Sequence, residues 1–292
     1  MARRTPRVKR NLPTWLNAIS VGVRACNARK KLYDLENLEP RLLLSATELA
    51  IASGVTEIEL TQSGSNVQVR QLTGGAQTSS DTLTADADGY TLNLSSGSDT
   101  ITVTATNALT GSSGILTFNG GDGDDSITFN SAIDFGGLDL VVNAEDIDAG
   151  ASADLDTTGD ITFNADASST SYTSSPTASI VLAAGSSLSA ANITLDADAV
   201  LDDGSGGNLT VALGANATQT VNPTAEVEAL GQLAATSSAS ITATVTTRLD
   251  LDLSQYDLNL TLSPSAKAVV GSQADVDAAT FTLSATIDGE LD

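Results

Sequence analysis

The segment Gly120–Thr128 contains the residues of this chain that are best suited to cation chemistry. Its glycines allow the backbone to turn tightly and to aim several carbonyl oxygens at one point. Asp125 adds an anionic oxygen, and Ile127 anchors the short strand that follows. Calcium in proteins prefers roughly six to eight oxygen ligands of this kind. The types and spacing of these residues indicate either a calcium turn or an ordinary acidic turn between two strands.

The same segment matches every fixed position of the nonapeptide G-G-x-G-x-D-x-U-x and so resembles the calcium-binding repeat of RTX proteins. The resemblance implies these calcium ligands: Gly121, Asp122, Gly123, Asp124 and Asp125. In that repeat a calcium ion is shared between stacked turns, so one copy supplies half of a site. Two nearby segments, 97–101 and 111–119, match the pattern only in part. Calcium is therefore the one cofactor that we expect, and a calcium-binding module that folds after export is one functional hypothesis.

Catalytic chemistry has little support in the composition. The chain has no His and a single Cys, which excludes His-based acid–base catalysis, imidazole metal sites and an internal disulfide framework. Paired carboxylates could still act as the acid and base of a glycosidase, and β-helix proteins include polysaccharide lyases and hydrolases. Beyond residue 41, however, the only basic residues are Arg70, Arg248 and Lys267, which are far apart in the sequence. We therefore expect no enzyme, with a carbohydrate-active β-helix enzyme as the alternative.

Charge divides the chain into two unequal parts. Residues 1–41 contain ten basic and three acidic residues, a net charge of +7, whereas residues 42–292 contain three basic and 33 acidic residues, a net charge of −30. Such asymmetry is typical of a separate basic segment attached to an acidic domain. An acidic domain repels phosphates, so we expect no nucleic-acid partner.

The basic N-terminal segment contains a helical pattern and a short motif. Apolar residues recur at helical spacing between residues 12 and 23, but no stretch approaches the ~20 apolar residues of a membrane span. The string 38–46, LEPRLLLSA, resembles the LEPR-XLL motif, found near the N-terminus of large, repetitive, exported bacterial proteins, notably of planctomycetes. The motif positions are Leu38, Glu39, Pro40, Arg41, Leu43 and Leu44. The resemblance implies that residues 1–46 are a targeting segment recognised by an export machinery.

The remainder of the chain reads as short strands. A tetrad in which two apolar residues flank a Thr recurs seven times, beginning at residues 100, 126, 160, 192, 208, 240 and 280. Apolar residues two apart predict strands with one buried face. The apolar positions 161, 193, 209 and 241 are separated by 32, 16 and 32 residues, which predicts a fixed structural repeat. Long helices are not expected, because Thr, Ser, Gly, Asn and Asp favour strands and turns.

These patterns predict an all-β protein whose body is a right-handed parallel β-helix, or β-solenoid, behind a partly helical or disordered basic segment. Antiparallel β-sandwich units are the alternative. The expected organisation is a targeting segment at 1–46, a β-rich entry region or cap at 47–110 and a solenoid body at 111–292. We expect an exported, non-enzymatic extracellular or cell-surface protein, an adhesin-like structural stalk whose partner is an unknown surface or matrix ligand.

Overall fold

The computed structural model describes residues 47–84, 89–169, 174–202, 218–249, 259–272 and 274–291, all within the compact unit Ser45–Asp292. Over these residues every regular element is a strand, which confirms the predicted all-β class. None of them forms a helix long and apolar enough to cross a bilayer. The predicted targeting segment, including all six motif positions, lies outside the described residues.

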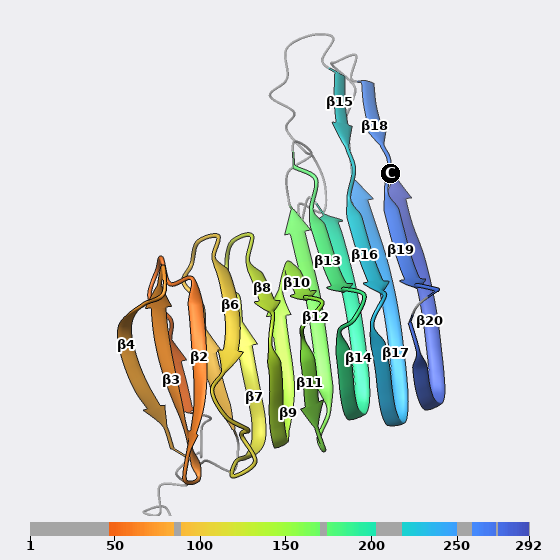
Figure 1. The fold of residues 1–292 in the computed structure, drawn as a ribbon. Coiled ribbons are helices and arrows are strands. Elements are labelled where there is room, and N and C mark those ends of the chain that lie inside the picture. Colours follow the sequence, from red (N-terminus) through yellow and green to blue (C-terminus); the bar gives the residue numbers. More distant parts are fainter. Residues whose placement is uncertain are drawn as a thin grey trace, which may run out of the picture. The chain divides into compact units, whose positions relative to one another are not determined.

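One sheet, sheet A, runs from the N-terminal to the C-terminal part of the unit (Figure 1). Its strands are β1 (Thr47–Ala50), β5 (Tyr90–Asn93), β7 (Ser113–Asn119), β9 (Ala132–Ala144), β11 (Asp154–Thr157), β12 (Ile161–Ser169), β14 (Ser187–Asp202), β17 (Gln232–Leu249) and β20 (Val276–Leu291). Every pairing given for this sheet is parallel.

The second sheet, sheet B, is mixed. In spatial order its strands are β19 (Ser265–Val270), β16 (Thr224–Ala229), β13 (Thr177–Leu182), β10 (Asp146–Ala149), β8 (Ser126–Phe129), β6 (Thr100–Ala105), β2 (Glu57–Ser63), β3 (Asn66–Thr73) and β4 (Ala76–Leu83). The pairings β2–β3 and β3–β4 are antiparallel, and the others are parallel. A separate pair, β15 (Thr218–Val221) and β18 (Asn259–Leu262), is also parallel.

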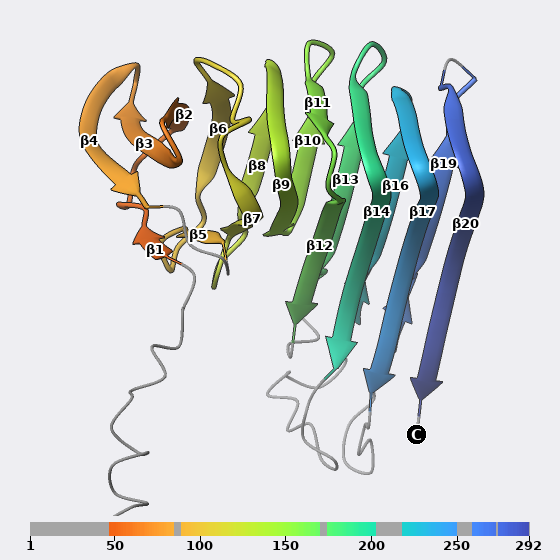
Figure 2. The same cartoon turned by 90° about the horizontal axis from the view of Figure 1, so that it is seen from below.

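The chain passes alternately between the two sheets. From β5 to β10 each successive strand lies in the other sheet, and the alternation continues through β12, β13 and β14 and then through β16, β17, β19 and β20. Figure 2 shows β12, β14, β17 and β20 of sheet A side by side along their length, with β13, β16 and β19 of sheet B in a second layer behind them. One hydrophobic core contains residues from both sheets and from the whole length of the unit, including residues on both sides of position 110.

The predicted fixed repeat is wrong. Along sheet A, hydrogen-bonded neighbours align the residues Leu92, Phe118, Val142, Phe163, Leu195, Ile241 and Leu283, with separations of 26, 24, 21, 32, 46 and 42 residues. Ile161 does pair with Ile193, but Ile193 then pairs with Ala239 and not with Ile241. The two longest separations include the additional strands β15 and β18, which pair with each other outside sheets A and B.

One part of sheet A has an unusual set of pairings, in which β9, β11, β14 and β12 form a closed circuit of four strands. The register explains it. The beginning of β9 pairs with β11 and its end pairs with β12, and β14 likewise pairs first with β11 and then with β12. We therefore regard β11 and β12 as two halves of one interrupted strand that lies between β9 and β14.

The alternation of apolar and polar residues along each strand determines which side chains enter the core. In the tetrads at 100, 126, 160, 192 and 240, the two apolar residues are buried and the residues between them are not, as predicted. The tetrad at 208 lies outside the described residues, and the one at 280 is exposed throughout because it belongs to the edge strand β20. Val, Ile, Leu and Ala fill most of the core. Phe118, Phe129 and Phe163 form a fully buried ring cluster that joins the two sheets.

Candidate functional site

The turn at 120–125 connects β7 in sheet A with β8 in sheet B, and its glycines are required by the backbone. Gly121 and Gly123 have φ of 94° and 142°, values that favour glycine over other residues. A Cβ on Gly123 would lie 2.8 Å from the carbonyl carbon of Gly97. The turn at 120–125 therefore packs directly on the turn at 95–99, which contains the start of the partial nonapeptide 97–101.

Three carboxylates accept backbone hydrogen bonds where the turns 95–99 and 120–125 pack together, a region that we call the corner. Asp99 accepts hydrogen bonds from the backbone N–H and the hydroxyl of Ser95, at 2.9 and 2.7 Å. Oδ1 of Asp125 accepts the N–H of Asp99 at 2.8 Å, and Oε2 of Glu145 accepts the N–H of Asp125 at 2.8 Å. Each carboxylate thus accepts one backbone N–H. Two of these N–H groups, those of Ser95 and Asp99, belong to the turn at 95–99. These hydrogen bonds give the acidic residues a structural role that requires no bound cation.

Asp125 is the most unusual of the three. Its side chain is only 1% exposed, and Oδ2 has no hydrogen-bond partner among the described residues. Burial raises the pKa of Asp125; the hydrogen bond from Asp99 opposes that shift, and the charges of Asp99 and Asp124 add to it. Burial likewise raises the pKa of Glu145, against the hydrogen bond that it accepts from Asp125. The corner therefore places negative charge where solvent stabilises it poorly.

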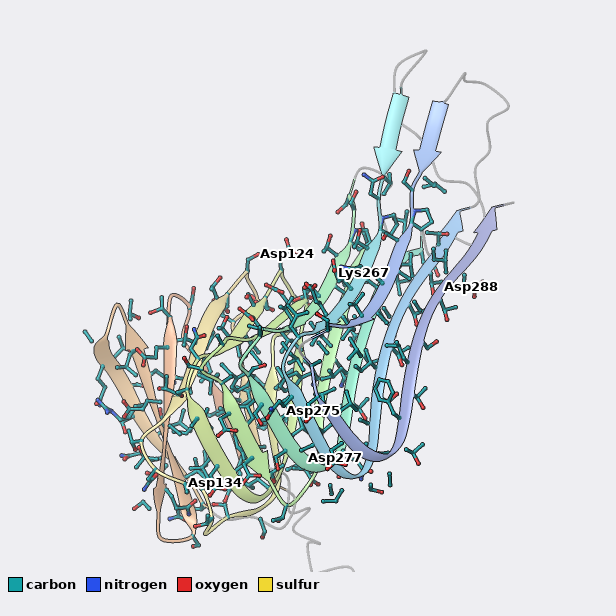
Figure 3. The ribbon with its side chains drawn as sticks, turned by 45° about the vertical axis from the view of Figure 1, so that its right-hand side comes forward. Asp124, Asp134, Lys267, Asp275, Asp277 and Asp288 are labelled. Carbon is teal, nitrogen blue, oxygen red and sulfur yellow. The ribbon has the colours of Figure 1, made fainter. Side chains whose placement is uncertain are left out.

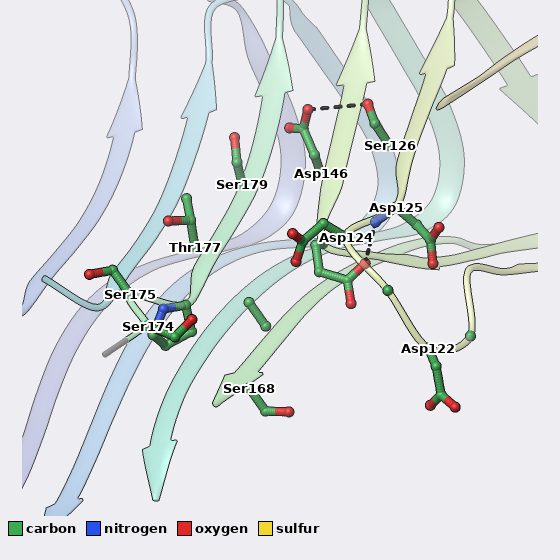
Figure 4. A pocket seen from close by; sticks show the side chains of 15 residues that line it. Asp122, Asp124, Asp125, Ser126, Asp146, Ser168, Ser174, Ser175, Thr177 and Ser179 are labelled. Carbon is green, nitrogen blue, oxygen red and sulfur yellow. Dashed lines mark hydrogen bonds between the residues drawn. The ribbon is translucent and has the colours of Figure 1, made fainter. Parts of the chain in front are cut away.

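The outer side of this corner opens into a recess of about 750 Å³ (Figure 4). Asp122, Asp124 and Asp146 line it as exposed side chains, and the opposite wall is formed mostly by small hydroxyl-bearing residues between Ser168 and Ser179. The hydroxyl of Ser126 donates to Asp146 at 3.2 Å, as the dashed line in Figure 4 shows.

The structure thus brings all five predicted calcium residues to one turn at the edge of this recess. Among the described residues, however, no group of three or more acidic or thiol side chains converges closely enough to hold a metal ion. The other partial nonapeptide, 111–119, forms mostly the strand β7, and its Gly111 lies against the carbonyl of Gly64.

A second, smaller recess of about 320 Å³ is relevant to the carbohydrate hypothesis. Asp134, Asp154 and Asp156 line it, and none of its lining residues is basic. Asp134 and Asp156 are paired in register on β9 and β11. In the part of the chain whose side chains are described, Arg70 is ion-paired with Glu59 and Lys267 with Glu226, so both basic groups contact acids elsewhere.

The sequence prediction missed a row of asparagines along sheet A. Asn93, Asn119, Asn143 and Asn164 are aligned by register, each at the outward-facing position after a buried residue. Side-chain amides join them in pairs, from Asn119 to Asn93 at 3.1 Å and from Asn164 to Asn143 at 2.9 Å. The signal was present as the recurring pattern apolar–x–apolar–Asn, although residues 127–130 share this pattern and begin on β8 of sheet B, outside the row.

Comparisons with protein-family models, curated proteins and solved structures gave no match for this chain.

Proposed function

We propose that this chain is an exported, non-enzymatic protein of the cell surface or extracellular matrix. In this proposal its body is a right-handed parallel β-solenoid that acts as a structural or adhesive stalk. The observation that carries the proposal is the long set of parallel ladders, in which aligned buried residues recur across sheet A from Leu92 to Ile241. A protein built of stacked layers gains length by adding layers, while each layer contacts only its neighbours.

The character of the surface supports a passive stalk. Residues 42–292 carry a net charge of −30, and most of the acids that the structure describes occupy outward-facing or corner positions. A strong net charge keeps an elongated molecule soluble and discourages nonspecific association with other acidic polymers. A ligand of such a wall would be a neutral or cationic surface component.

Export is the part of the proposal that depends on residues 1–46. Their charge of +7, with ten basic and three acidic residues, contrasts with the acidic remainder and accompanies the LEPR-XLL-like string. The test is to express the tagged full chain, and the same chain without residues 1–46, in a planctomycete. Protease treatment of intact cells should degrade only the full chain. If both forms resist the protease and remain with a cytoplasmic marker, the proposal of an exported stalk is wrong.

We also propose weak calcium binding at the turn Gly121–Asp125, because Oδ2 of the buried Asp125 has no hydrogen-bond partner among the residues that the structure describes. Since Oδ1 already accepts the N–H of Asp99, and Asp122, Asp124 and Asp146 are exposed, the coordination is incomplete. We expect a dissociation constant no better than about 10⁻⁴–10⁻³ M, the range of extracellular modules.

Calorimetry at physiological salt tests the calcium proposal. Asp125→Asn should abolish the calcium heat, whereas Asp81→Asn, a matched loss of charge on β4 away from this turn, should leave it unchanged. Equal heats from both variants would show that calcium responds only to the diffuse acidic surface, which salt screens within ~8 Å.

A further inference from the structure

The sequence contains one residue pair that is prone to chemical modification. Asn119 is the only asparagine of the chain that is followed by glycine. In such a pair the backbone nitrogen of the glycine reaches the side-chain carbonyl carbon of the asparagine easily, because glycine has no Cβ to hinder the approach and its backbone turns freely. Every other asparagine precedes a residue with a side chain. Asn119 is therefore the asparagine whose amide the chain itself attacks most readily.

The folded protein has a structural use for both residues of this pair. Gly120 is buried, and a Cβ there would lie 2.8 Å from Oδ2 and 3.0 Å from Cβ of Asp125. Asp124, labelled in Figure 3, lies in the same turn as Gly120. Nδ2 of Asn119 donates to Oδ1 of Asn93 at 3.1 Å and so connects β7 with β5. The packing of Asp125 and the amide contact with Asn93 thus favour the two residue types that make the pair reactive.

The peptide group between Asn119 and Gly120 is hydrogen-bonded on both sides. Its C=O, that of Asn119, accepts the N–H of Leu94 at 2.8 Å. Its N–H, that of Gly120, donates to the C=O of Asn143 at 2.8 Å. Asn119 is also the last residue of β7, paired in register with Asn93 of β5 and Asn143 of β9. The nitrogen of Gly120 is therefore directed at Asn143 and not at the side chain of Asn119.

We propose that Asn119 is a deamidation site that folding closes. In the unfolded chain the backbone nitrogen of Gly120 loses its proton to hydroxide and forms a bond with Cγ of Asn119, and Nδ2 leaves as ammonia. Water then opens the resulting cyclic imide at one of its two carbonyl carbons. Opening at one carbon gives aspartate, and opening at the other gives isoaspartate, in which the main chain runs through the former side chain. In the folded protein the same nitrogen keeps its proton in the hydrogen bond to Asn143, so the reaction requires local opening of this layer.

The two products have different effects on the fold. Aspartate leaves the main chain unchanged, and the amide of Asn93 can rotate and donate to the new carboxylate. Isoaspartate adds a methylene group to the main chain, so the end of β7 no longer pairs in register with both Asn93 and Asn143. Gly120 is then displaced from its position against Asp125. A chain that stays unfolded for too long therefore loses its ability to fold, and the site acts as a timer on the unfolded state.

Mass spectrometry of the full chain tests the reaction. One sample is incubated folded in mildly alkaline buffer and the other unfolded in guanidinium chloride, with circular dichroism to establish both states. Asn119 should deamidate at least about tenfold more slowly in the folded sample. Asn66, which precedes Val67, serves as the internal reference and should remain an amide in both. Gly120→Ala should slow the reaction in guanidinium chloride, where its packing has no effect. Equal rates in the folded and unfolded samples, or an amide at position 119 that persists in guanidinium chloride as it does at Asn66, would overturn the proposal.

Refolding tests the timer separately. After increasing times in guanidinium chloride the wild type is diluted into buffer, and the folded protein is isolated by size-exclusion chromatography. The folded fraction should fall with time, and isoaspartate at position 119 should be confined to the material that fails to fold. Asn119→Thr cannot form the imide and keeps a residue type that favours strands, so it should lose its refolding yield much more slowly. The timer is refuted if this variant loses yield as fast as the wild type, or if the folded fraction contains as much isoaspartate as the remainder.

Discussion

Phe129 connects the two sheets through its ring, and its removal is the most direct test of the described core. The side chain lies on β8 of sheet B and is fully buried. It packs edge-on against Phe118 with ring centroids 6.1 Å apart, and it stacks on Phe163 at 5.8 Å with an angle of 4° between the planes. Both of these partners belong to sheet A.

The expected cost of Phe129→Ala follows from these contacts. Truncation of a buried Phe to Ala removes about 3–5 kcal/mol of unfolding free energy, through lost burial and the cavity left behind. Each ring pair adds about 0.5–1.5 kcal/mol beyond burial, so the upper part of the range, about 4–5 kcal/mol, applies here. A domain has only about 5–15 kcal/mol in total, so the variant should be close to unfolded at 37 °C.

The assay is urea denaturation followed by far-ultraviolet circular dichroism, with Phe135→Ala as the matched control. Phe135 is equally buried, and no ring contact is described for it. Phe135→Ala should therefore lower the unfolding free energy by at least about 1 kcal/mol less than Phe129→Ala does. A double-mutant cycle of Phe129→Ala and Phe163→Ala should give a coupling of about 0.5–1.5 kcal/mol. A coupling near zero, or a greater loss for Phe135→Ala, would refute the role assigned to the ring cluster.

Three further predictions concern the turn and the acidic faces. Gly123→Ala should lower the unfolding free energy by about 1–3 kcal/mol, because the added Cβ would overlap the backbone of Gly97. The control is Gly97→Ala in the same denaturation assay. A Cβ on Gly97 enters open space and should change the unfolding free energy by less than about 0.5 kcal/mol. Asp196→Asn should raise the melting temperature slightly at pH 7 and not at pH 3, since burial and the neighbouring charges of Asp198 and Asp166 raise the pKa of Asp196; a loss of stability at pH 7 would contradict this. The whole body should also become more stable as the pH falls from 7 towards the ordinary carboxyl pKa values of 3.8 and 4.5. Five described carboxylates have raised pKa values, so they bind protons more tightly in the folded state than in the unfolded state. Melting temperatures that fall with decreasing pH over this window would refute the prediction.

The sequence predicted which residues face inward but not which strands align. Alternation has a period of two, so a slip of one residue reverses the faces whereas a slip of two preserves them. Positions 193 and 241 were expected to be equivalent points of one repeat, but Ile193 pairs with Ala239, two residues before Ile241. An irregularity between Ala235 and Ser238 shifts the register further. The pattern of buried residues alone contains no information that distinguishes these registers.

The antiparallel start of the fold was a different kind of omission. Gly64 lies in the turn between β2 and β3, and Gly74 and Gly75 lie in the turn between β3 and β4; all three have positive φ. Gly-Gly between two alternating segments is a recognised hairpin signal. The hairpins were therefore readable from the sequence, whereas their attachment to the rest of sheet B, through the parallel pairing of β2 with β6, joins residues distant along the chain.

The role of Asp125 could not be decided from the sequence, because a carboxylate suits a cation and a backbone N–H equally well. The pattern placed it correctly at a tight glycine turn. Only the stacking of that turn on Gly97 shows that Oδ1 receives the N–H of Asp99. The same stacking makes Glu145, which no motif had indicated, a third member of the corner.

The uneven spacing of the aligned strands has a consequence for how such a protein can diversify. Phe163 and Leu195 are 32 residues apart, and Leu195 and Ile241 are 46 apart, yet both pairs keep the same hydrogen-bonded alignment. Loop closure costs only about 0.6 kcal/mol for each doubling of loop length. Insertions at the connections are therefore nearly neutral for folding, so mutation and selection can vary these segments, and engineers can graft peptides into them, without redesigning the interior.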